Sequence, residues 1–393
     1  MNVAVVAPQT SDWEDSHRAG AILARAFLKL GHRAWLVAGV YHNDRQLEVA
    51  EAVERSELGY IELREDPSGV PAVRVLSIKP LFQPAVSFRG FAKILSKLEE
   101  TYGLDLVVVL SSFWNGPEEV AKLASIKRTL AAAGEAVRKT AYVYIPFYMG
   151  RARGRPIEAA TRAMWTSLNM PAIVRNVDLV VATCREEVEE LRQLRTPQEK
   201  ILENRNWLDP ELAEAIERAP PRQFGEFKAV VSYIGPMEEE KNVKGLARLA
   251  EKLESRGVAL AVAGAGEAAE RLRQKPNVIY VERPGEVPAL IKSSLAGVDL
   301  SHHEAAGIRT LEFLYGGVPV ATSPSSRASC YISNGVDGIY LRNADDIHGV
   351  VSWVDMLMAR GEVRREMGKK AQEKARGLSA ASLAEAIIKR LPS

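Results

Sequence analysis

The stretch SHHEAAGIRTLEFLYGGVPVATSPS, residues 301–325, predicts a helix and the strand that follows it. Apolar residues at helical spacing indicate a helix over 307–315, and a glycine pair ends it. Apolar runs at 298–300 and 318–321 are typical of short buried strands on either side of that helix. Buried strands that alternate with helices indicate parallel strands in an α/β sheet.

Two glutamates in this stretch are candidates for a binding site. Glu304 follows the first strand and lies just before the helix, and Glu312 lies inside the helix. At helical spacing Glu312 shares a face with Ile308, Leu311 and Tyr315, which places a carboxylate among apolar side chains. Burying a carboxylate without a partner costs several kcal/mol, roughly, so we expect Glu312 to have a hydrogen-bonding partner.

A bound polyol, such as a ribose or a hexose, would be a suitable partner. The alternative is that Glu312 caps a loop amide and that Glu304 is a solvated strand end. The start of the helix favours a ligand. Gly307 opens the helix, and the amides of a helix N-terminus attract an anion such as a diphosphate.

The same alternation of strands and helices runs through both halves of the chain. In the first half we expect strands at 3–7, 34–38, 105–110, 140–145 and 179–182, and helices at 18–30, 118–133, 158–175 and 186–195. In the second half we expect further strands at 230–234, 259–262 and 279–281, and further helices at 243–255, 287–293, 345–360, 364–375 and 380–391. The pattern predicts an α/β protein with two doubly wound, Rossmann-like domains. They would face a cleft at the carboxyl ends of their strands, where open α/β sheets bind ligands.

A break in the pattern near Asn204 indicates the domain boundary. The segment that follows contains Pro210, Pro220, Pro221 and Gly225, and we interpret it as an interdomain connection. The sequence therefore predicts an N-terminal domain over 1–206 and a C-terminal domain over 207–379.

Composition excludes several classes of protein. The chain has 393 residues and a net charge of +2, which gives no reason to expect nucleic-acid binding. Cys184 and Cys330 are its two cysteines, which fits a reducing compartment and excludes a disulfide scaffold. We find neither a signal peptide nor a run of roughly 20 apolar residues that would span a membrane. We expect a cytoplasmic protein, with peripheral contact at the inner membrane face left open.

Two glycine turns in the second half resemble phosphate-binding loops. Gly235 ends one strand and allows close backbone approach, and Lys241 follows it, where its ammonium could reach a diphosphate. The alternative is a plain strand-to-helix turn with a surface lysine. Gly264 lies in a second short glycine turn, which lacks the full dinucleotide fingerprint. No such fingerprint and no Gly-x-x-x-x-Gly-Lys loop occurs, which argues against NAD or FAD enzymes and ordinary ATPases.

A metal site is not expected. His302, His303 and Glu304 are adjacent, but neighbouring residues at a strand end point to opposite faces, so they would rarely share one ion.

In the first half, the loop FYMGRARGRP contains Arg151, Arg153 and Arg155 directly after a strand. It would bind an anionic acceptor or an anionic membrane surface, and the alternative is a solvated basic loop. His17 lies at the start of the first long helix, where it would either point into the cleft or have a structural role.

The second half resembles the donor-binding domain of GT-B fold retaining glycosyltransferases of family four, also called glycosyl transferases group one. The resemblance covers residues 233 to about 375, and its blocks are YIGPMEEEKNVKGL, LAVAGAGE, the segment from Glu304 to Glu312 with GGVPVAT, ISNGVDGIYL and REMGKKAQEKARGLS. The first half resembles the acceptor domain only loosely.

The resemblance implies a role for each candidate residue. Glu304 would contact the donor sugar, Glu312 the ribose hydroxyls, and Lys241 the departing diphosphate. The diphosphate would also meet Gly235, Gly264 and the amides that follow Gly307, namely those of Ile308 and Arg309. The resemblance further implies a nucleoside-diphosphate sugar as co-substrate, no cofactor, no catalytic metal, and a last helix, 380–393, that crosses back to the first domain. The acceptor would be a glycan, a lipid or a small molecule.

The sequence departs from the family pattern at three places, one of which is the glycine pair usual in the first loop of the acceptor domain, replaced here by residues around Trp13–Ser16. Pro236 stands where the family usually has arginine, so the missing cation would come from a residue such as Arg309 or Arg327. The histidine usual in the acceptor domain has no counterpart in YVYIPFYMGRARG. These departures leave two alternatives to a transferase: a non-catalytic relative that binds a nucleotide sugar or a protein partner, and a sugar-nucleotide epimerase.

Overall fold

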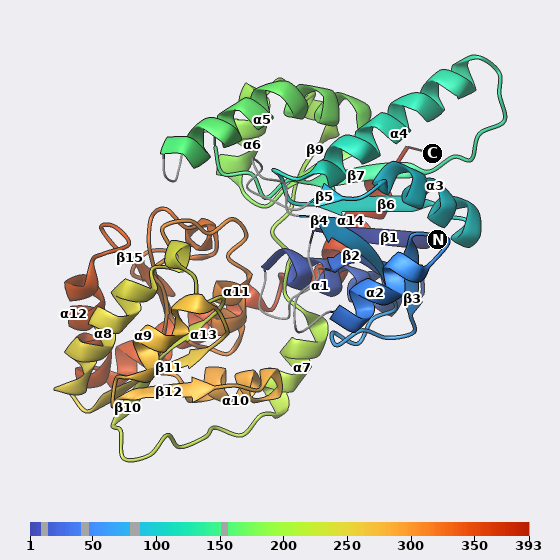
Figure 1. Ribbon diagram of the computed structural model, residues 1–393. Coiled ribbons are helices and arrows are strands. Elements are labelled where there is room, and N and C mark those ends of the chain that lie inside the picture. Colours follow the sequence, from blue (N-terminus) through green and yellow to red (C-terminus); the bar gives the residue numbers. More distant parts are fainter. Residues whose placement is uncertain (9–14, 41–46, 79–86, 151–155, 393) are drawn as a thin grey trace. The chain divides into compact units, whose positions relative to one another are not determined.

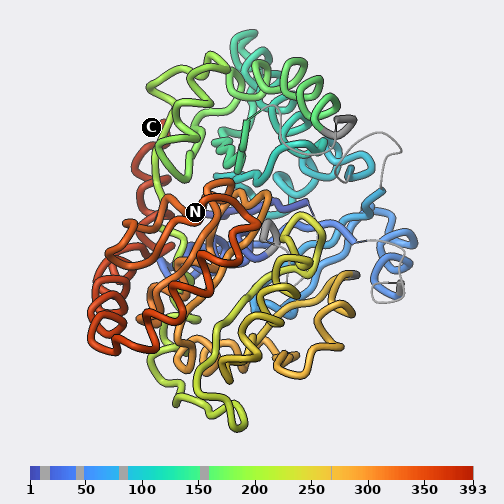
Figure 2. Tube along the Cα trace, turned by 90° about the vertical axis from the view of Figure 1, so that its left-hand side faces the viewer, coloured from blue at the N-terminus to red at the C-terminus, as the bar shows by residue number. Residues whose placement is uncertain are grey.

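The computed structural model describes residues 1–8, 15–40, 47–78, 87–150 and 156–392, and the other residues are drawn in grey in Figures 1 and 2. The chain divides into two compact units. Unit 1 contains Met1–Arg205 and Ala380–Ser393, and unit 2 contains Asn206–Ser379. Each unit is built on its own mainly parallel sheet, as the alternation in the sequence predicted.

The sheet of unit 1 has the strand order β3-β4-β2-β1-β6-β7-β8-β9, with the short β5 beside β4. All described pairs are parallel except those that β3 and β5 make with β4. The strands are β1 (Asn2–Ala7), β2 (Arg33–Val40), β3 (Tyr60–Leu63), β4 (Ala72–Ile78), β5 (Ser87–Phe88), β6 (Leu106–Leu110), β7 (Ala141–Ile145), β8 (Leu179–Ala182) and β9 (Ile201–Glu203).

Helices cover both faces of this sheet. On one face, alternate strand residues such as Val107 and Val109 join apolar side chains of four helices in one buried cluster. These helices are α3 (Phe91–Tyr102), α4 (Asn115–Ala132), α5 (Pro156–Asn176) and α6 (Arg185–Gln193). The other face is covered by α1 (Asp15–Lys29), against which the last helix, α14 (Ala380–Arg390), packs (Figure 1). The helix α2 (Leu47–Arg55) packs against β4 and η1 (Gln198–Lys200) precedes β9.

The sheet of unit 2 has the order β12-β11-β10-β13-β14-β15, and its described pairs are all parallel. The strands are β10 (Ala229–Ile234), β11 (Val258–Ala263), β12 (Val278–Val281), β13 (Ala296–Asp299), β14 (Val320–Thr322) and β15 (Gly338–Tyr340). The order turns back between β10 and β13. In a doubly wound sheet, that reversal marks the place where ligands bind beyond the carboxyl ends of the strands.

One face of the second sheet packs against α8 (Val243–Glu254), α9 (Glu270–Arg273) and α12 (Ile347–Ala359), whose apolar residues form one cluster with the strands. On the other face lie α10 (Val287–Ser293) and α11 (Ile308–Tyr315), and α11 packs against α13 (Gly361–Ala375). The helix α7 (Pro210–Arg218) packs against α10. The 3₁₀ turns are η2 (Glu239–Lys241), η3 (Glu267–Ala269), η4 (Pro284–Glu286) and η5 (Arg327–Tyr331).

The predicted helix over 307–315 is confirmed as α11. The predicted strands beside it are β13 and β14, each displaced by two residues at its start and by one residue at its end. The segment interpreted as a plain connection contains a helix, α7, because Asp209 caps its first turn by accepting the Glu211 amide at 3.0 Å and Pro210 stands where a proline suits a helix start.

Candidate functional site

Two loops at the carboxyl edge of the unit 2 sheet lie backbone against backbone. The loop after β10 begins at Gly235 (φ 153°), and the loop after β11 begins at Gly264 (φ 157°). A Cβ atom on Gly264 would lie 1.8 Å from the Gly235 carbonyl oxygen, so a side chain there would push the loops apart. The Gly235 amide donates to the Ala263 carbonyl at 2.9 Å. These glycines therefore allow the two loops to pack closely at this edge.

Lys241 and Glu304 meet at this edge, although 62 residues separate them in the sequence. The Lys241 Nζ lies 2.5 Å from Glu304 Oε2, and each side chain is only 11% exposed. The second oxygen, Oε1, accepts the backbone amides of Ala306 and Gly307, both at 2.9 Å. Glu304 thus ties a cation from the loop after β10 to the start of α11, and it is not a solvated strand end.

The charge state of Glu304 follows from these contacts. Burial alone would raise the pKa of Glu304, and Asp299 adds to that effect. The Lys241 ammonium and the Gly307 amide outweigh both, so the pKa of Glu304 lies below its ordinary value. Glu304 is therefore an anion at neutral pH.

The first turn of α11 combines an unusual backbone with an open amide. Gly307 has φ 64°, and a Cβ atom there would lie 2.6 Å from Ala328 Cα, so only glycine fits. Its amide is used by Glu304. The amide of Ile308, which starts the helix, has no protein acceptor within the described part of the chain. At the positive end of the helix dipole, this amide is available to an anion.

Glu312 is fully buried, as its place on the apolar face predicted. Arg309, one turn earlier in α11, donates from Nη1 to Glu312 Oε2 at 3.4 Å. Arg309 is itself only 11% exposed at its side chain. This ion pair partly compensates the buried charge of Glu312. Arg309 is also a residue that the sequence offers as a source of the cation missing at Pro236.

A set of hydroxyl groups at the same edge was missed from the sequence. The loop after β14 carries Ser323 and Ser326: Ser323 donates to the Ser301 carbonyl at 2.6 Å, and Ser326 donates to Asp299. Asp299 is the last residue of β13 and also accepts the Ser301 amide at 3.0 Å. The run SPSS after a predicted strand was the signal, since residues that follow parallel strands collect at one edge of the sheet.

The carboxyl edge of unit 1 also contains features that the sequence did not reveal. Ser111 and Phe113, after β6, have φ of 68° and 69°, and Phe147, after β7, has φ of 46°. Side-chain-bearing residues rarely adopt this conformation, and such strain concentrates at functional sites. The Arg162 guanidinium lies 5.3 Å from the centre of the Phe113 ring, and Trp165 packs against the same ring.

The structure does not describe the contacts of the predicted acceptor-side residues. His17 lies in α1, but its side chain is outside the described residues. Arg151, Arg153 and Arg155 are outside the described residues altogether. Within the described ranges, no helix is both long and apolar enough to cross a bilayer.

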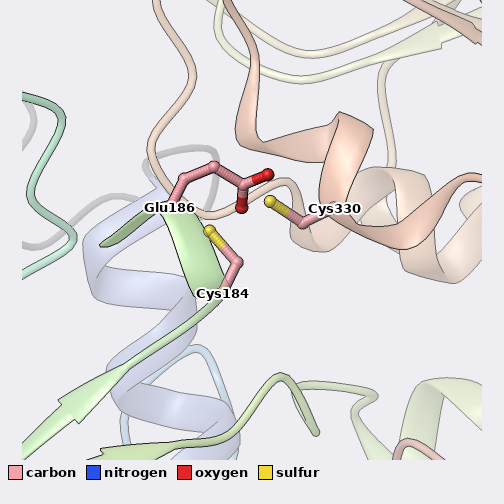
Figure 3. A group of neighbouring side chains, drawn as sticks. All are labelled: Cys184, Glu186 and Cys330. Atoms are coloured by element: carbon pink, nitrogen blue, oxygen red, sulfur yellow. The ribbon is translucent and has the colours of Figure 1, made fainter. Parts of the chain in front are cut away.

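One group of metal-ligand side chains is drawn in Figure 3. Cys184 directly precedes α6, Glu186 lies in its first turn, and Cys330 belongs to η5. Two of these residues are in unit 1 and the third is in unit 2, so neither unit holds the group by itself. We therefore assign no metal centre to them.

Comparison with known proteins gives a match to the second half of the chain. Residues 216–374 match the family model described as glycosyl transferases group 1, and this match contains the unit 2 residues of the candidate site. No curated protein sequence matches the chain.

Solved structures match over nearly the whole chain. The structure of Alr3699/HepE from Anabaena in complex with UDP and glucose is 13% identical, with 99% of this chain and 98% of that one covered and a TM-score of 0.66. Sucrose-phosphate synthase from Thermosynechococcus elongatus is 16% identical, with coverages of 99% and 98% and a TM-score of 0.67. WaaG, a glycosyltransferase involved in lipopolysaccharide biosynthesis, is 14% identical, with both chains fully covered and a TM-score of 0.62. Identities this low establish the fold alone.

Proposed function

We propose that this chain is a retaining group 1 glycosyl transferase, since residues 216–374 match that family's model, and that it moves a hexose from UDP-hexose to an acceptor on unit 1, without a metal ion. The observation that carries the proposal is the buried Lys241–Glu304 pair beside the open amide of Ile308. A cation and a helix N-terminus at one sheet edge are suited to a diphosphate.

Lys241 and the helix start would stabilise the leaving group. When the bond between the sugar and the diphosphate breaks, negative charge develops on the diphosphate oxygens. An ammonium and an oriented amide in a site that is largely closed to water stabilise such charge without reorganising at the moment of reaction. This arrangement would perform the part that a metal ion plays in other transferases, so we expect transfer to continue in the presence of a chelator.

Glu304 is in contact with both groups, and we propose that it positions them. One oxygen holds the Lys241 ammonium and the other holds the amides of Ala306 and Gly307. Its own charge also faces the donor sugar in the proposed complex, where it would stabilise positive charge that develops on the ring. Glu312 would bind the ribose hydroxyls, because a fully buried carboxylate retains strong acceptor capacity beside Arg309.

UDP is the first nucleotide to test, since it is bound in the HepE structures that match this chain. We place the acceptor at the carboxyl edge of unit 1, near Phe113 and Trp165, and its class stays open between a glycan, a lipid and a small molecule. The cysteines, neither of them in a disulfide, support a cytoplasmic protein. The basic loop that contains Arg151 would contact an anionic membrane surface. The alternative is that this loop is only solvated.

Calorimetric titration with UDP, GDP and ADP tests the donor site. We expect UDP to bind, and we expect Glu312→Gln to weaken it by roughly tenfold or more, because a hydrogen bond to a charged group is worth about 1.5–3 kcal/mol. Glu217→Gln is the matched control. Glu217 accepts the Tyr315 hydroxyl at 2.6 Å, at the opposite end of α11.

Equal UDP binding by the parent and Glu312→Gln would remove the ribose assignment. Binding of UDP without hydrolysis or transfer from UDP-glucose, under any acceptor condition, would favour a non-catalytic relative. Loss of transfer in the chelator EDTA, restored by a divalent cation, would contradict the metal-free mechanism.

A further inference from the structure

Unit 1 contains a pocket of about 690 Å³ at the amino ends of its central strands. Its walls come from residues that directly precede β6, β7 and β8, and from the C-terminal parts of α4 and α14. Figure 1 shows both marked chain ends on this side of unit 1. β6 is five residues long, which separates the two edges of the sheet by about 16 Å at a rise of about 3.3 Å per residue. The pocket is therefore distinct from the carboxyl edge of the same sheet.

The Arg138 guanidinium is hydrogen-bonded to the protein through two of its nitrogen atoms, and its third nitrogen atom is open. Its Nε donates to the Leu104 carbonyl at 3.0 Å, and its Nη2 donates to the Gly103 carbonyl at 2.5 Å and to Asp105 at 3.0 Å. Gly103 ends α3, so the guanidinium satisfies carbonyl groups at a helix C-terminus. Within the described ranges, Nη1 has no hydrogen-bond acceptor, and the side chain is 46% exposed.

Arg128 repeats this arrangement on the other side of β7. Its Nη2 donates to the carbonyl of Asn176, the last residue of α5, at 2.6 Å and to Asp178 at 2.9 Å. Its Nε and Nη1 have no acceptor among the residues that the structure describes, and the side chain is 45% exposed. Two guanidinium groups that each have open N–H groups therefore line one pocket.

The carboxylates that hold these arginines are themselves fixed to the sheet. Asp105 accepts the Asn2 amide and Asp178 accepts the Tyr142 amide, both at 2.8 Å. Because β7 lies between β6 and β8, the two aspartates stand two strand spacings apart, roughly 10 Å. An arginine whose position is already fixed loses little freedom when it binds an anion, and its fork geometry suits a phosphate.

The rest of the pocket wall is mainly apolar. Ala124 and Ala131 line it from α4, and Ile388 and Leu391 line it from the C-terminal segment. Its ionisable side chains are mostly basic: Lys127, Arg128, Arg138 and Lys139, against Asp105 and Asp178. A ligand that fits both features has an anionic group and an apolar body.

We propose that this pocket is a second ligand site of the enzyme, which binds an amphiphilic phosphate: a phosphate group between Arg128 and Arg138, joined to an apolar body that lies against α4 and the C-terminal segment. The volume falls within the range of roughly 300–1,000 Å³ that is usual for small-molecule sites. The site is independent of the donor and acceptor sites proposed above.

Calorimetric titration of the whole chain with hexyl phosphate, inorganic phosphate and hexan-1-ol tests the proposal. We expect hexyl phosphate to bind once per chain, at least about tenfold tighter than either of the other two. Burial of two methylene groups already contributes a factor of that order over inorganic phosphate, and a hydrogen bond to a charged group, worth about 1.5–3 kcal/mol, contributes a similar factor over hexan-1-ol. Equal binding of inorganic phosphate, equal binding of hexan-1-ol, or no binding of hexyl phosphate would each overturn the proposal.

Two pairs of variants locate the site. Ala131→Trp should abolish hexyl phosphate binding by filling the pocket, whereas Ala132→Trp, at the neighbouring exposed position outside the lining, should not. Arg128→Gln should weaken binding at least about tenfold, whereas Arg248→Gln, which removes an exposed, paired arginine of unit 2, should not. Melting temperatures identify any variant that fails to fold. Unchanged binding in both Ala131→Trp and Arg128→Gln would overturn the proposal.

A membrane lipid and a soluble metabolite could both supply this chemistry, and a second arm separates them. The parent chain is sedimented with phosphatidylcholine vesicles that contain phosphatidic acid. Sedimentation that Ala131→Trp abolishes would support the pocket as a lipid headgroup site. Hexyl phosphate binding without sedimentation would support it as a site for a soluble phosphate ester.

Discussion

Two buried lysine–glutamate pairs, one in each unit, have similar distances but different surroundings. In unit 1, Lys127 on α4 lies 2.7 Å from Glu99 on α3. In unit 2, Lys241 lies 2.5 Å from Glu304. The lysine side chains are 17% and 11% exposed, and the glutamates are 4% and 11% exposed. Charge, distance and burial therefore do not distinguish a structural pair from a functional one.

The partners of each pair do distinguish them. In unit 1, Glu99 also accepts the Tyr142 hydroxyl at 2.6 Å, and Lys127 also donates to the Thr140 hydroxyl at 3.2 Å. Burial and then the Glu99 charge raise the pKa of Tyr142 far above its usual range, so that hydroxyl stays protonated and continues to donate. Tyr142 belongs to β7 and Thr140 directly precedes it, so this pair joins parts of the core.

In unit 2, the partners of Glu304 are loop and helix-start amides at a sheet edge, and the neighbouring Ile308 amide is open. A pair of this kind holds groups ready for a ligand. Changes to the Lys127–Glu99 pair should therefore mainly affect stability, and changes to the Lys241–Glu304 pair should mainly affect activity.

The largest effect is expected in unit 1. Lys127→Met leaves the Glu99 carboxylate buried without its cation, and breaking a buried ion pair in this way costs about 3–5 kcal/mol of unfolding free energy. UDP binding should stay within a factor of two. Urea unfolding measures the first quantity and calorimetry the second. The control is Lys122→Met on the same helix, whose pair with Glu119 is exposed and should contribute no more than about 0.5 kcal/mol.

The comparison fails if Lys127→Met unfolds at the same urea concentration as the parent, or if it loses UDP binding while remaining folded. Either result would mean that the two pairs cannot be assigned separate roles from their partners.

The next effect is expected in unit 2. Lys241→Ala should lower the rate of sugar release from UDP-hexose by about 10²–10³-fold, as is usual when one group that stabilises developing charge is removed. Its affinity for UDP-hexose should fall less than its rate, because the charge on the leaving group is greater in the transition state than in the bound donor. Lys244→Ala is the control. Lys244 lies three residues after Lys241 in the chain, and it forms an exposed ion pair with Glu239. A Lys241→Ala variant with the parent's turnover would remove Lys241 from the chemistry.

The sequence predicted the fold of both units because strand and helix periodicity survives in their most buried elements, such as β6 and α11. It missed the strands β3, β4, β5, β9 and β15 and the helices α2, α3, α7 and α9. The strand β3 is half-exposed, and its partly polar sequence YIEL lacks the continuous apolar run of a buried strand. Residues 79–86, between β4 and β5, lie outside the described residues.

Part of the candidate site could also be predicted. Glu304, Glu312 and Gly307 were found because each breaks a local pattern, as a carboxylate on an apolar face or a glycine at a helix start. The Lys241–Glu304 pair could not be found from local patterns, since its members come from different loops and meet only when the strand order brings β10 beside β13. The strained backbone at Phe113 and Phe147 also could not be predicted, because neither composition nor residue spacing indicates it.

The smallest effect concerns how the stability of unit 2 depends on pH, and it tests the role of Lys241 beside Glu304. The pKa of Glu304 is lowered in the folded chain, whereas an unfolded glutamate titrates near pH 4.3, roughly. Ionised Glu304 therefore contributes stability above that pH, and the contribution is lost as pH falls through the folded pKa. In Lys241→Met the main lowering cause is gone and the effect of burial remains, so the pKa of Glu304 should rise relative to the parent.

It follows that Lys241→Met should be destabilised most at pH 7 and progressively less as pH approaches 4, because protonation of Glu304 removes a buried charge that no longer has its cation. Urea midpoints at pH 7, 5 and 4 measure this difference, with Lys244→Met as the control that should show no such trend. A destabilisation that is constant across the range would mean that Lys241 is not what keeps Glu304 ionised. The amides of Ala306 and Gly307 would then be sufficient, and Lys241 would be free to turn from Glu304 to the diphosphate without loss to the fold.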